Sequence, residues 1–510
     1  MATQNPPVSQ TRSFSTVFLI EMWERFGYYG MQALIVYYMV QRLGFPDEKA
    51  NLVWSAAAAL IYVAPAIGGW VGDKVLGTRR TMLLGAVILS IGYALMAVPT
   101  ESVWFLYCSL GVIVVGNGLF KPNAGNLVRK IYDGDDSKID SAFTIYYMAV
   151  NIGSTLSMLL TPWIKDYINE KYGNELGWHV AFAVCAFGLV VGLANYMVMR
   201  RTMSHVGSPP DERPLHFGKL LTVLGIGVAA VFASAYVLGH EAVARWFVYI
   251  AGAAVLGIFA YLISSSERSE RAGLIAALVL TVQTVFFFVF YQQMSTSLNL
   301  FALRNVNPSF DIFGFHLWNW APAQFQSFNP IWIFILSPIL AMVYNAAGRN
   351  GKDMSIATKF ALGFAAVALG FFIYSWANHF AVDGKTSSWV MVWGYGASSL
   401  GELLVSGLGL AMIARYVPAR MGGFMMGAYF VASGISQYLG GIVANLASVP
   451  ENVTDPVQTM PIYTSLFAKL GWAGVACTLI ALAVLPLMRK LSAEHHSHNG
   501  NDKAPLPAEQ

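Results

Sequence analysis

Apolar segments of membrane-spanning length recur along this chain of 510 residues. A helix needs about 20 mostly apolar residues to cross the hydrocarbon core of a bilayer. Backbone groups in lipid must be hydrogen-bonded within a helix or a closed barrel, so segments of this length predict a bundle of spanning helices. Fourteen such segments are predicted, at 14–41, 50–73, 80–98, 103–127, 141–163, 178–200, 216–238, 244–265, 272–302, 325–347, 356–378, 387–415, 421–447 and 463–488.

The composition places the chain among all-α polytopic membrane proteins. Hydrophobic residues make up 56% of it and charged residues 11%, with a mean hydropathy of +0.54, whereas soluble domains carry about 25% charged residues. The net charge of +4 gives no basis for nucleic-acid binding. Cys108, Cys185 and Cys477 lie in apolar runs and are predicted to be packed side chains, and no metal site is expected.

Polar interruptions divide the spans into groups. The polar stretch 200–215 follows six spans, and the next two spans carry no charge well within the membrane. Six further spans follow. We predict an N-terminal six-helix bundle at 1–200, a linker with two inserted helices at 201–270, a C-terminal six-helix bundle at 271–491 and a disordered cytoplasmic tail at 492–510.

The distribution of basic residues predicts the orientation. Of the 31 Lys and Arg residues, 21 lie on the side of the N-terminus and eight on the opposite side. Cytoplasmic loops are enriched in such residues, so both termini are expected in the cytoplasm. The aromatic-rich loop 304–323 is then expected at the outer interface.

The first span carries Glu21, Glu24 and Arg25, although each charge at mid-membrane costs roughly 2.5 to 3.5 kcal/mol. Positions 21, 24, 25, 28, 29 and 32 share one helix face and are Glu, Glu, Arg, Tyr, Tyr and Gln. This stripe predicts a helix that lines a water-accessible passage for protons or a charged solute. The alternative is a permanent buried salt bridge.

The stretch 68–80, GGWVGDKVLGTRR, lies at the end of the second span. Asp73 is expected to accept hydrogen bonds from neighbouring helix N-termini or basic groups, so Asp73, Arg79 and Arg80 are predicted to form a conformational latch. A plain positive-inside anchor is the alternative. The spacing resembles the loop signature of the major facilitator superfamily.

Three later spans also carry polar groups. Lys121 precedes Pro122 in the fourth span and is expected to face the same cavity as Glu21, although it could instead snorkel to the interface. Tyr147 and Asn151 share a helix face, which in membranes is more often interhelical packing. Glu402 is the only acidic residue deep within the second-half spans, with Ser406 one turn later, and predicts a site.

Together these motifs resemble the proton-coupled oligopeptide transporter family of the major facilitator superfamily. The family signature E-x-x-E-R-F-x-Y-Y-G stands at 21–30, F-x-x-x-Y-x-x-x-N-x-G at 143–153, and the K-P pair at Lys121. The resemblance covers nearly the whole chain. It implies two six-helix bundles with two extra helices between them, and a monomeric functional unit in the bacterial cytoplasmic membrane. It also implies proton-driven uptake of di- and tripeptides by alternating access, without enzymatic activity and without a cofactor apart from the coupling protons.

The resemblance also implies roles for individual residues. Arg25 and Lys121 would receive the peptide carboxylate, and Glu402, with Asn329 and Asn151, would receive the amino group. Residues implied to line the same pocket are Tyr29, Gln32, Tyr62, Tyr147 and, as a weaker candidate, Ser406. The chain departs from many members at Gln32, where they carry a second arginine, and at Tyr291, Gln292 and Gln293, where they carry an acidic residue in the seventh helix.

We further hypothesise that Glu21 and Glu24 exchange a proton while pairing alternately with Arg25 and Lys121, as a coupled acid–base set. Other readings stay open: a different small anion or zwitterion, such as nitrate or an amino acid, a peptide sensor, or a channel. An intramembrane enzyme is not expected, since no H-E-x-x-H or G-x-S-x-G pattern stands on a span.

Overall fold

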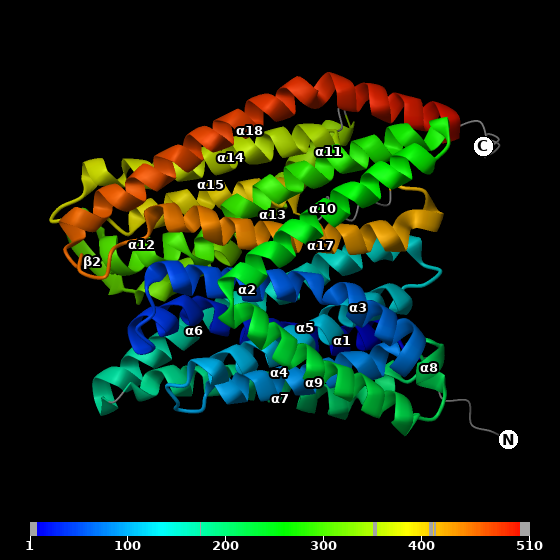
Figure 1. The fold of residues 1–510 in the computed structure, drawn as a ribbon, viewed down its shortest axis with the longest axis horizontal. Coiled ribbons are helices and arrows are strands. Elements are labelled where there is room, and N and C mark those ends of the chain that lie inside the picture. The colour runs from blue at the N-terminus through cyan, green and yellow to red at the C-terminus, as the bar shows by residue number, and fades with distance from the viewer. Residues whose placement is uncertain (1–7, 174, 350–353, 407–411, 413–414, 500–510) are drawn as a thin grey trace.

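The computed structural model describes residues 8–173, 175–349, 354–406, 412 and 415–499. The chain forms two helical bundles that lie side by side along their length, one from each half of the sequence (Figure 1). The first bundle contains α1 Gln10–Tyr37, α2 Asp47–Val63, α3 Pro65–Val71, α4 Thr78–Met96, α5 Val103–Ile131, α6 Asp136–Tyr172 and α7 Leu176–Met199.

The second bundle follows the inserted segment. It contains α11 Arg268–Tyr291, α12 Ser297–Asn305, α13 Phe328–Arg349, α14 Ile356–Trp376, α15 Trp389–Val405, α17 Gly422–Ala444 and α18 Pro456–Asn499. α1 begins and α18 ends at the same end of the molecule (Figure 1), which we call the termini end. The opposite end carries the only two strands of the described residues, and we call it the hairpin end.

The inserted segment lies against both bundles. A short helix, α8 Pro209–Glu212, precedes α9 Phe217–Gly239 and α10 Glu241–Ser265. α9 packs on α5 of the first bundle, and α10 packs on α17 and α11 of the second (Figure 1). The helices α9 and α10 therefore lie across the boundary between the two bundles, one against each bundle.

Twelve helical stretches of the described residues are long and apolar enough to cross a membrane. α1 and α15 are not among them, because α1 carries three charges within its apolar stretch and α15 has only 17 residues. Both pack against spanning helices, α1 on α6 and α15 on α14. Counting these two helices with the twelve gives the predicted fourteen.

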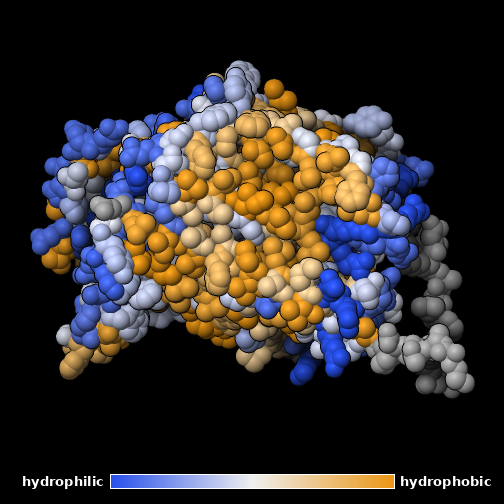
Figure 2. All heavy atoms as spheres, turned by 90° about the horizontal axis from the view of Figure 1, so that it is seen from below, coloured by the Kyte–Doolittle hydropathy of each residue, from blue (hydrophilic) through white to orange (hydrophobic). Residues whose placement is uncertain are grey.

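The surface agrees with a membrane-embedded bundle. In Figure 2 apolar side chains cover the middle of the face, and hydrophilic ones gather toward its two ends. Large apolar side chains stay exposed in this protein, among them Phe187 at 68% and Val198 at 84%. Water would penalise such a surface, and lipid tails would not.

The predicted outer loop contains a β-hairpin that the sequence analysis did not anticipate. β1 Ser309–Ile312 pairs antiparallel with β2 Phe315–Asn319. Phe313 and Gly314 both have positive φ, as a tight two-residue hairpin turn requires. Phe310 is buried among aromatic rings that anchor the hairpin to the second bundle, namely Trp318, Trp320, Phe325, Phe328 and Trp389.

The predicted disorder from residue 492 onward is wrong for residues 492–499, because α18 continues to Asn499. Leu491 and His495 are buried, and His495 Nε2 lies 3.0 Å from the Arg415 carbonyl oxygen. These contacts hold the last turns of the helix against the bundle, which the polar composition did not reveal. Residues 500–510 lie outside the described part of the chain.

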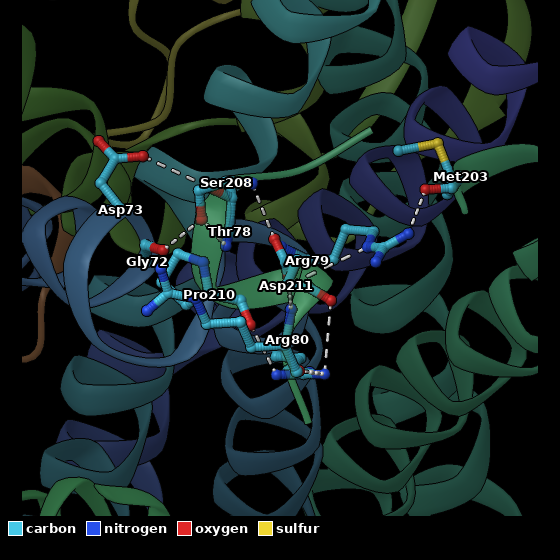
Figure 3. A network of polar contacts seen from close by, with 10 residues as sticks. Gly72, Asp73, Thr78, Arg79, Arg80, Met203, Ser208, Pro210 and Asp211 are labelled. Atoms are coloured by element: carbon cyan, nitrogen blue, oxygen red, sulfur yellow. Dashed lines mark hydrogen bonds and ion pairs between the residues drawn. The ribbon is translucent and has the colours of Figure 1, made fainter. Parts of the chain in front are cut away.

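Two of the predicted latch residues, Arg79 and Arg80, contact the linker after α7, whereas Asp73 lies beside a basic residue, as expected. Asp211, in α8, accepts hydrogen bonds from the backbone N–H groups of Arg79 at 3.1 Å and Arg80 at 3.3 Å (Figure 3). Ser208 accepts from the N–H of Thr78 at 3.0 Å and donates to the Gly72 carbonyl at 2.8 Å. The linker therefore caps the N-terminus of α4, where unpaired N–H groups favour an anion.

The arginine side chains bind the same linker. Arg79 donates to the Met203 carbonyl, and Arg80 donates to the carbonyls of Pro210 at 2.9 Å and Arg213 at 2.6 Å (Figure 3). They do not pair with Asp73. We call this network, which joins residues 72–80 to residues 203–213, the linker clip.

Asp73 has other partners. It accepts from the Thr78 hydroxyl at 3.4 Å and lies 3.9 Å from Lys130 Nζ of α5. Its contacts thus stay within the first bundle, with α5 and the start of α4. Gly77, between the two parts of the motif, has φ +105°, and a Cβ there would lie 2.2 Å from the Asp211 carboxylate, so the turn requires glycine.

Replacing Asp211 should destabilise the protein. Asp211→Ala removes a buried carboxylate that holds three backbone N–H groups, those of Arg79, Arg80 and Ser208. The expected loss is about 3 kcal/mol of unfolding free energy, measured as a lower thermal midpoint of the purified protein in detergent. Glu212→Ala is the matched control, because that neighbouring side chain is exposed and should leave the midpoint unchanged. Equal midpoints for the two variants would contradict the clip.

Candidate functional site

A cavity of about 170 Å³ lies between the two bundles. Residues of α1, α2, α5 and α6 line it from the first bundle, and residues of α11, α13, α15 and α17 line it from the second. Sites for drug-sized ligands are commonly about 300–1,000 Å³, so this space suits a small solute. Both halves of the chain are needed to enclose it.

All ten residues predicted to bind substrate line this one cavity. They are Arg25, Tyr29, Gln32, Tyr62, Lys121, Tyr147, Asn151, Asn329, Glu402 and Ser406. Of the polar stripe on α1, Tyr28 lines it as well, whereas Glu21 and Glu24 are buried behind Arg25 and do not. The structure thus brings the predicted side chains together, while their roles remain predictions.

The positive side of the cavity comes from the first bundle. Arg25 is 4% exposed and binds Glu24 with two nitrogens, Nε at 2.5 Å and Nη2 at 2.8 Å. Glu21 Oε1 lies 3.7 Å from Arg25 Nε. One guanidinium is therefore shared by two buried carboxylates, and breaking such a buried pair is costly.

Lys121 supplies a second cation and is the freer of the two. Its ammonium lies 5.2 Å from the centre of the Tyr62 ring, and it pairs with no carboxylate of the described residues. Its side chain is exposed to the cavity. Lys121 thus lines the cavity as predicted, whereas Glu21 and Glu24 do not line it.

The close approach of α6 to α1 shapes this wall. A Cβ at Gly153 would lie 2.2 Å from the Met22 carbonyl oxygen, so only glycine allows the two helices to lie this close. Asn151 of α6 donates to the carbonyl of Tyr147 at 2.8 Å. Both side chains line the cavity, so they are more than interhelical packing.

The negative side comes from the second bundle. Glu402 of α15 is 8% exposed, and its Oε2 accepts from Asn329 Nδ2 at 2.5 Å. Its Oε1 accepts from the hydroxyl of Tyr147 at 3.5 Å. Since Tyr147 belongs to α6, this long hydrogen bond is a direct contact between the two bundles at the cavity.

The hairpin end of the cavity is closed by polar contacts between the bundles. Arg304 of α12 binds both carboxylate oxygens of Asp47 of α2, at 2.5 and 2.7 Å. The indole of Trp54 donates to the Ser295 hydroxyl at 3.0 Å. Two further contacts close the same end, Asn51 with Asn445 at 3.1 Å and Tyr37 with the Asn299 carbonyl at 2.5 Å.

Several cavity residues were not predicted from the sequence. They include Trp54, Phe288, Ser295, Gln326 and Gln437, together with Tyr291 and Gln292, which were noted only as departures from the family pattern. Gln326 and Gln437 carried a usable signal, because a polar amide within an apolar span needs a partner. Trp54 and Phe288 carried none, since aromatic residues are common in spans.

The charged and polar groups of the cavity are arranged to bind a small molecule. Cations from one bundle face a carboxylate and an amide from the other, which is complementary to a small molecule with a negative and a positive end. Among the described residues no group of His, Cys, Asp and Glu could hold a metal ion.

Comparison with characterised sequences gives closely related permeases. Dipeptide and tripeptide permease B of Aliivibrio fischeri is 40% identical over 486 residues, covering 95% of this chain and 96% of that protein. Dipeptide and tripeptide permease A of Pectobacterium carotovorum is 42% identical over 482 residues, covering 94% and 92%. Each relative therefore matches along nearly its whole length.

Solved structures of related transporters have the same fold. The crystal structure of tetrameric PepTSo2 has 69% identity and a TM-score of 0.88, covering 95% of this chain and all of that one. A peptide transporter crystallised with sulfate has 29% identity and a TM-score of 0.78, covering 94% and 95%. A sequence model of the POT family matches residues 79–466. The chain belongs to the POT family, the proton-coupled oligopeptide transporters that its motifs resemble.

Proposed function

We propose that this protein is a proton-driven symporter that takes up di- and tripeptides by alternating access. The observation that carries the proposal is the division of charge in the cavity: Arg25 and Lys121 come from one bundle, and Glu402 comes from the other. The relatives are permeases and peptide transporters rather than enzymes, which supports transport as the activity.

A short peptide would bridge the two charged sides. Its carboxylate would meet Lys121 and Arg25, and its amino group would meet Glu402, Asn329 and Asn151. The rest of the molecule would contact Tyr29, Tyr62, Tyr147, Ser406 and Gln32. Because the two poles lie on different bundles, a bound zwitterion attracts the bundles toward each other, and its binding energy can bias the conformational equilibrium.

Protons would enter through the acid–base set behind Arg25. Glu21 and Glu24 share Arg25, and Lys121 pairs with no carboxylate in the described part of the chain. Protonating one glutamate would weaken its hold on Arg25 and free that cation for the peptide carboxylate. No cofactor is proposed apart from the proton. One charge moving through 100 mV supplies about 2.3 kcal/mol, which is roughly forty- to fiftyfold accumulation.

The proposed location is the bacterial inner membrane, with both termini in the cytoplasm. The hairpin end then faces outward, and the contacts of Asp47 and Arg304 close the outer side of the cavity. One chain supplies every side chain of the site, so we propose a monomeric functional unit. That unit is compatible with tetramers, such as the one in the PepTSo2 crystals.

Glu402→Gln should impair recognition of the peptide amino group. Without the carboxylate the cavity loses a charge-assisted contact worth about 2 kcal/mol, so the KM for dialanine should rise about thirtyfold. Uptake of labelled dialanine into proteoliposomes under a pH gradient measures this. Excess nitrate or free alanine should compete poorly in wild type. Strong competition by either would favour the rival solute and count against peptides.

Glu21→Gln and Glu24→Gln should each uncouple transport from protons. The variants should lose accumulation driven by a pH gradient and keep exchange of labelled for unlabelled dialanine at equal pH, because exchange needs the binding site but no net proton movement. Glu48→Gln, at an exposed position, is the control and should accumulate normally. If the Glu21→Gln and Glu24→Gln variants still accumulate peptide fully, the salt bridge is only structural.

Asp47→Asn should favour opening of the hairpin end, because Arg304 loses its bidentate partner between the bundles. A cysteine placed at Met294, which lines the cavity, should then react several-fold faster with a charged thiol reagent added from outside. Cys108, Cys185 and Cys477 are replaced beforehand. Lys49→Gln, two residues away, should leave the rate unchanged. An unchanged rate in Asp47→Asn would show that this ion pair does not hold the closed state.

A further inference from the structure

Two glutamine side chains at the cavity each bury one amide atom without a partner. Gln326 is 2% exposed and Gln437 is 1% exposed. Gln326 Oε1 and Gln437 Nε2 have no hydrogen-bond partner among the described residues, and both residues line the cavity. Buried polar groups are nearly always hydrogen-bonded, so an acceptor and a donor are left for whatever fills this space.

The orientation of the Gln326 amide is fixed by its neighbours. Its Nε2 donates to the carbonyl of Ala33 on α1 at 3.4 Å, which leaves Oε1 as the unpaired atom. Gln326 lies in the 3₁₀ turn Pro322–Ser327, three residues before Asn329, the partner of Glu402. The acceptor therefore lies between α1, which carries Arg25, and the start of α13, which carries Asn329.

The donor comes from another helix of the second bundle. Gln437 lies on α17, which packs against α2 at two glycines: a Cβ at Gly434 would lie 2.8 Å from the Ala59 carbonyl, and one at Gly441 would lie 2.3 Å from the Ser55 hydroxyl. Gln437 lies about one turn from each glycine. This close packing places its amide at the cavity between the bundles.

One acceptor and one donor complement the N–H and the C=O of an amide bond. The charged sides of the cavity recognise only the two ends of a zwitterion, and a free amino acid has both ends. A peptide differs from an amino acid by its internal amide. A site that buries hydrogen-bonding atoms rejects ligands that leave them unpaired, so this pair can supply the selection that the charges cannot.

We propose that Gln326 and Gln437 are specificity-determining residues that bind the peptide bond of the substrate. Gln326 Oε1 accepts from the peptide N–H, and Gln437 Nε2 donates to the peptide C=O. This inference rests on the proposed function, because it presumes that a peptide occupies the cavity.

Backbone isosteres of dialanine test the pairing directly. The ketomethylene isostere keeps the carbonyl and replaces the N–H, whereas the E-alkene isostere replaces both groups. In wild type, competition against labelled dialanine should weaken about tenfold for the ketomethylene compound and about a hundredfold for the alkene, one factor of ten for each lost hydrogen bond.

Each variant should abolish one of these two tenfold differences in affinity and keep the other. Gln326→Leu should bind dialanine and the ketomethylene isostere within about twofold of each other. Gln437→Leu should bind the ketomethylene and alkene isosteres within about twofold of each other. Gln326→Met and Gln437→Met replace them if a leucine variant does not fold. Gln283→Leu is the matched control, since that buried glutamine also has an unpartnered oxygen but does not line the cavity, and it should keep both wild-type ratios.

Two outcomes would overturn the inference. Wild type that binds the alkene isostere as tightly as dialanine does not recognise the amide, and this result needs no variant. Wild-type ratios in Gln326→Leu and Gln437→Leu would show that other groups bind the peptide bond. A wild-type protein that neither binds nor transports dialanine contradicts the proposed function instead, so the two failures are distinguishable.

Discussion

The structure depends on keeping ionised groups inside an apolar bundle at tolerable cost. Arg25 is stabilised by two carboxylates from its own helix, and Glu402 by an amide and a tyrosine hydroxyl. Lys121 has only a tyrosine ring and the cavity. Full pairing of all the charges would make a rigid core, and the unequal pairing leaves a cation and several amide atoms for a ligand.

The division of these groups between two bundles connects binding to movement. The cavity needs both halves, and its hairpin end is closed by a few polar contacts, of which the Asp47–Arg304 pair is the strongest by geometry. The linker clip, in contrast, stays on one side of the interface and joins α4 to the segment after α7. It therefore stiffens the first bundle as a unit, which suits rigid-body rocking.

The candidate site was predictable for two separate reasons. A charged residue in a membrane span is tolerated only where water or a partner reaches it, so Arg25, Lys121 and Glu402 each marked a site, and the family motifs implied that the three face one pocket. Gln326 and Gln437 were missed because a neutral amide is a weaker signal. The contact of Asp211 with Arg79 and Arg80 was not predicted, because these residues lie about 130 positions apart and the linker that carries Asp211 has only a polar composition as its signal.

Hydropathy and the cost of buried charge act on each segment separately, so they predicted the spanning helices and the charged positions from the chain alone, and the motifs gave the family and the residues implied to share a pocket. The pairing of side chains appeared only in the folded protein: Arg25 with Glu24, Arg304 with Asp47, Asp211 with the start of α4, and the continuation of α18 to Asn499. Those pairings depend on how helices pack against one another, and the periodicity of a single segment carries no record of its neighbours.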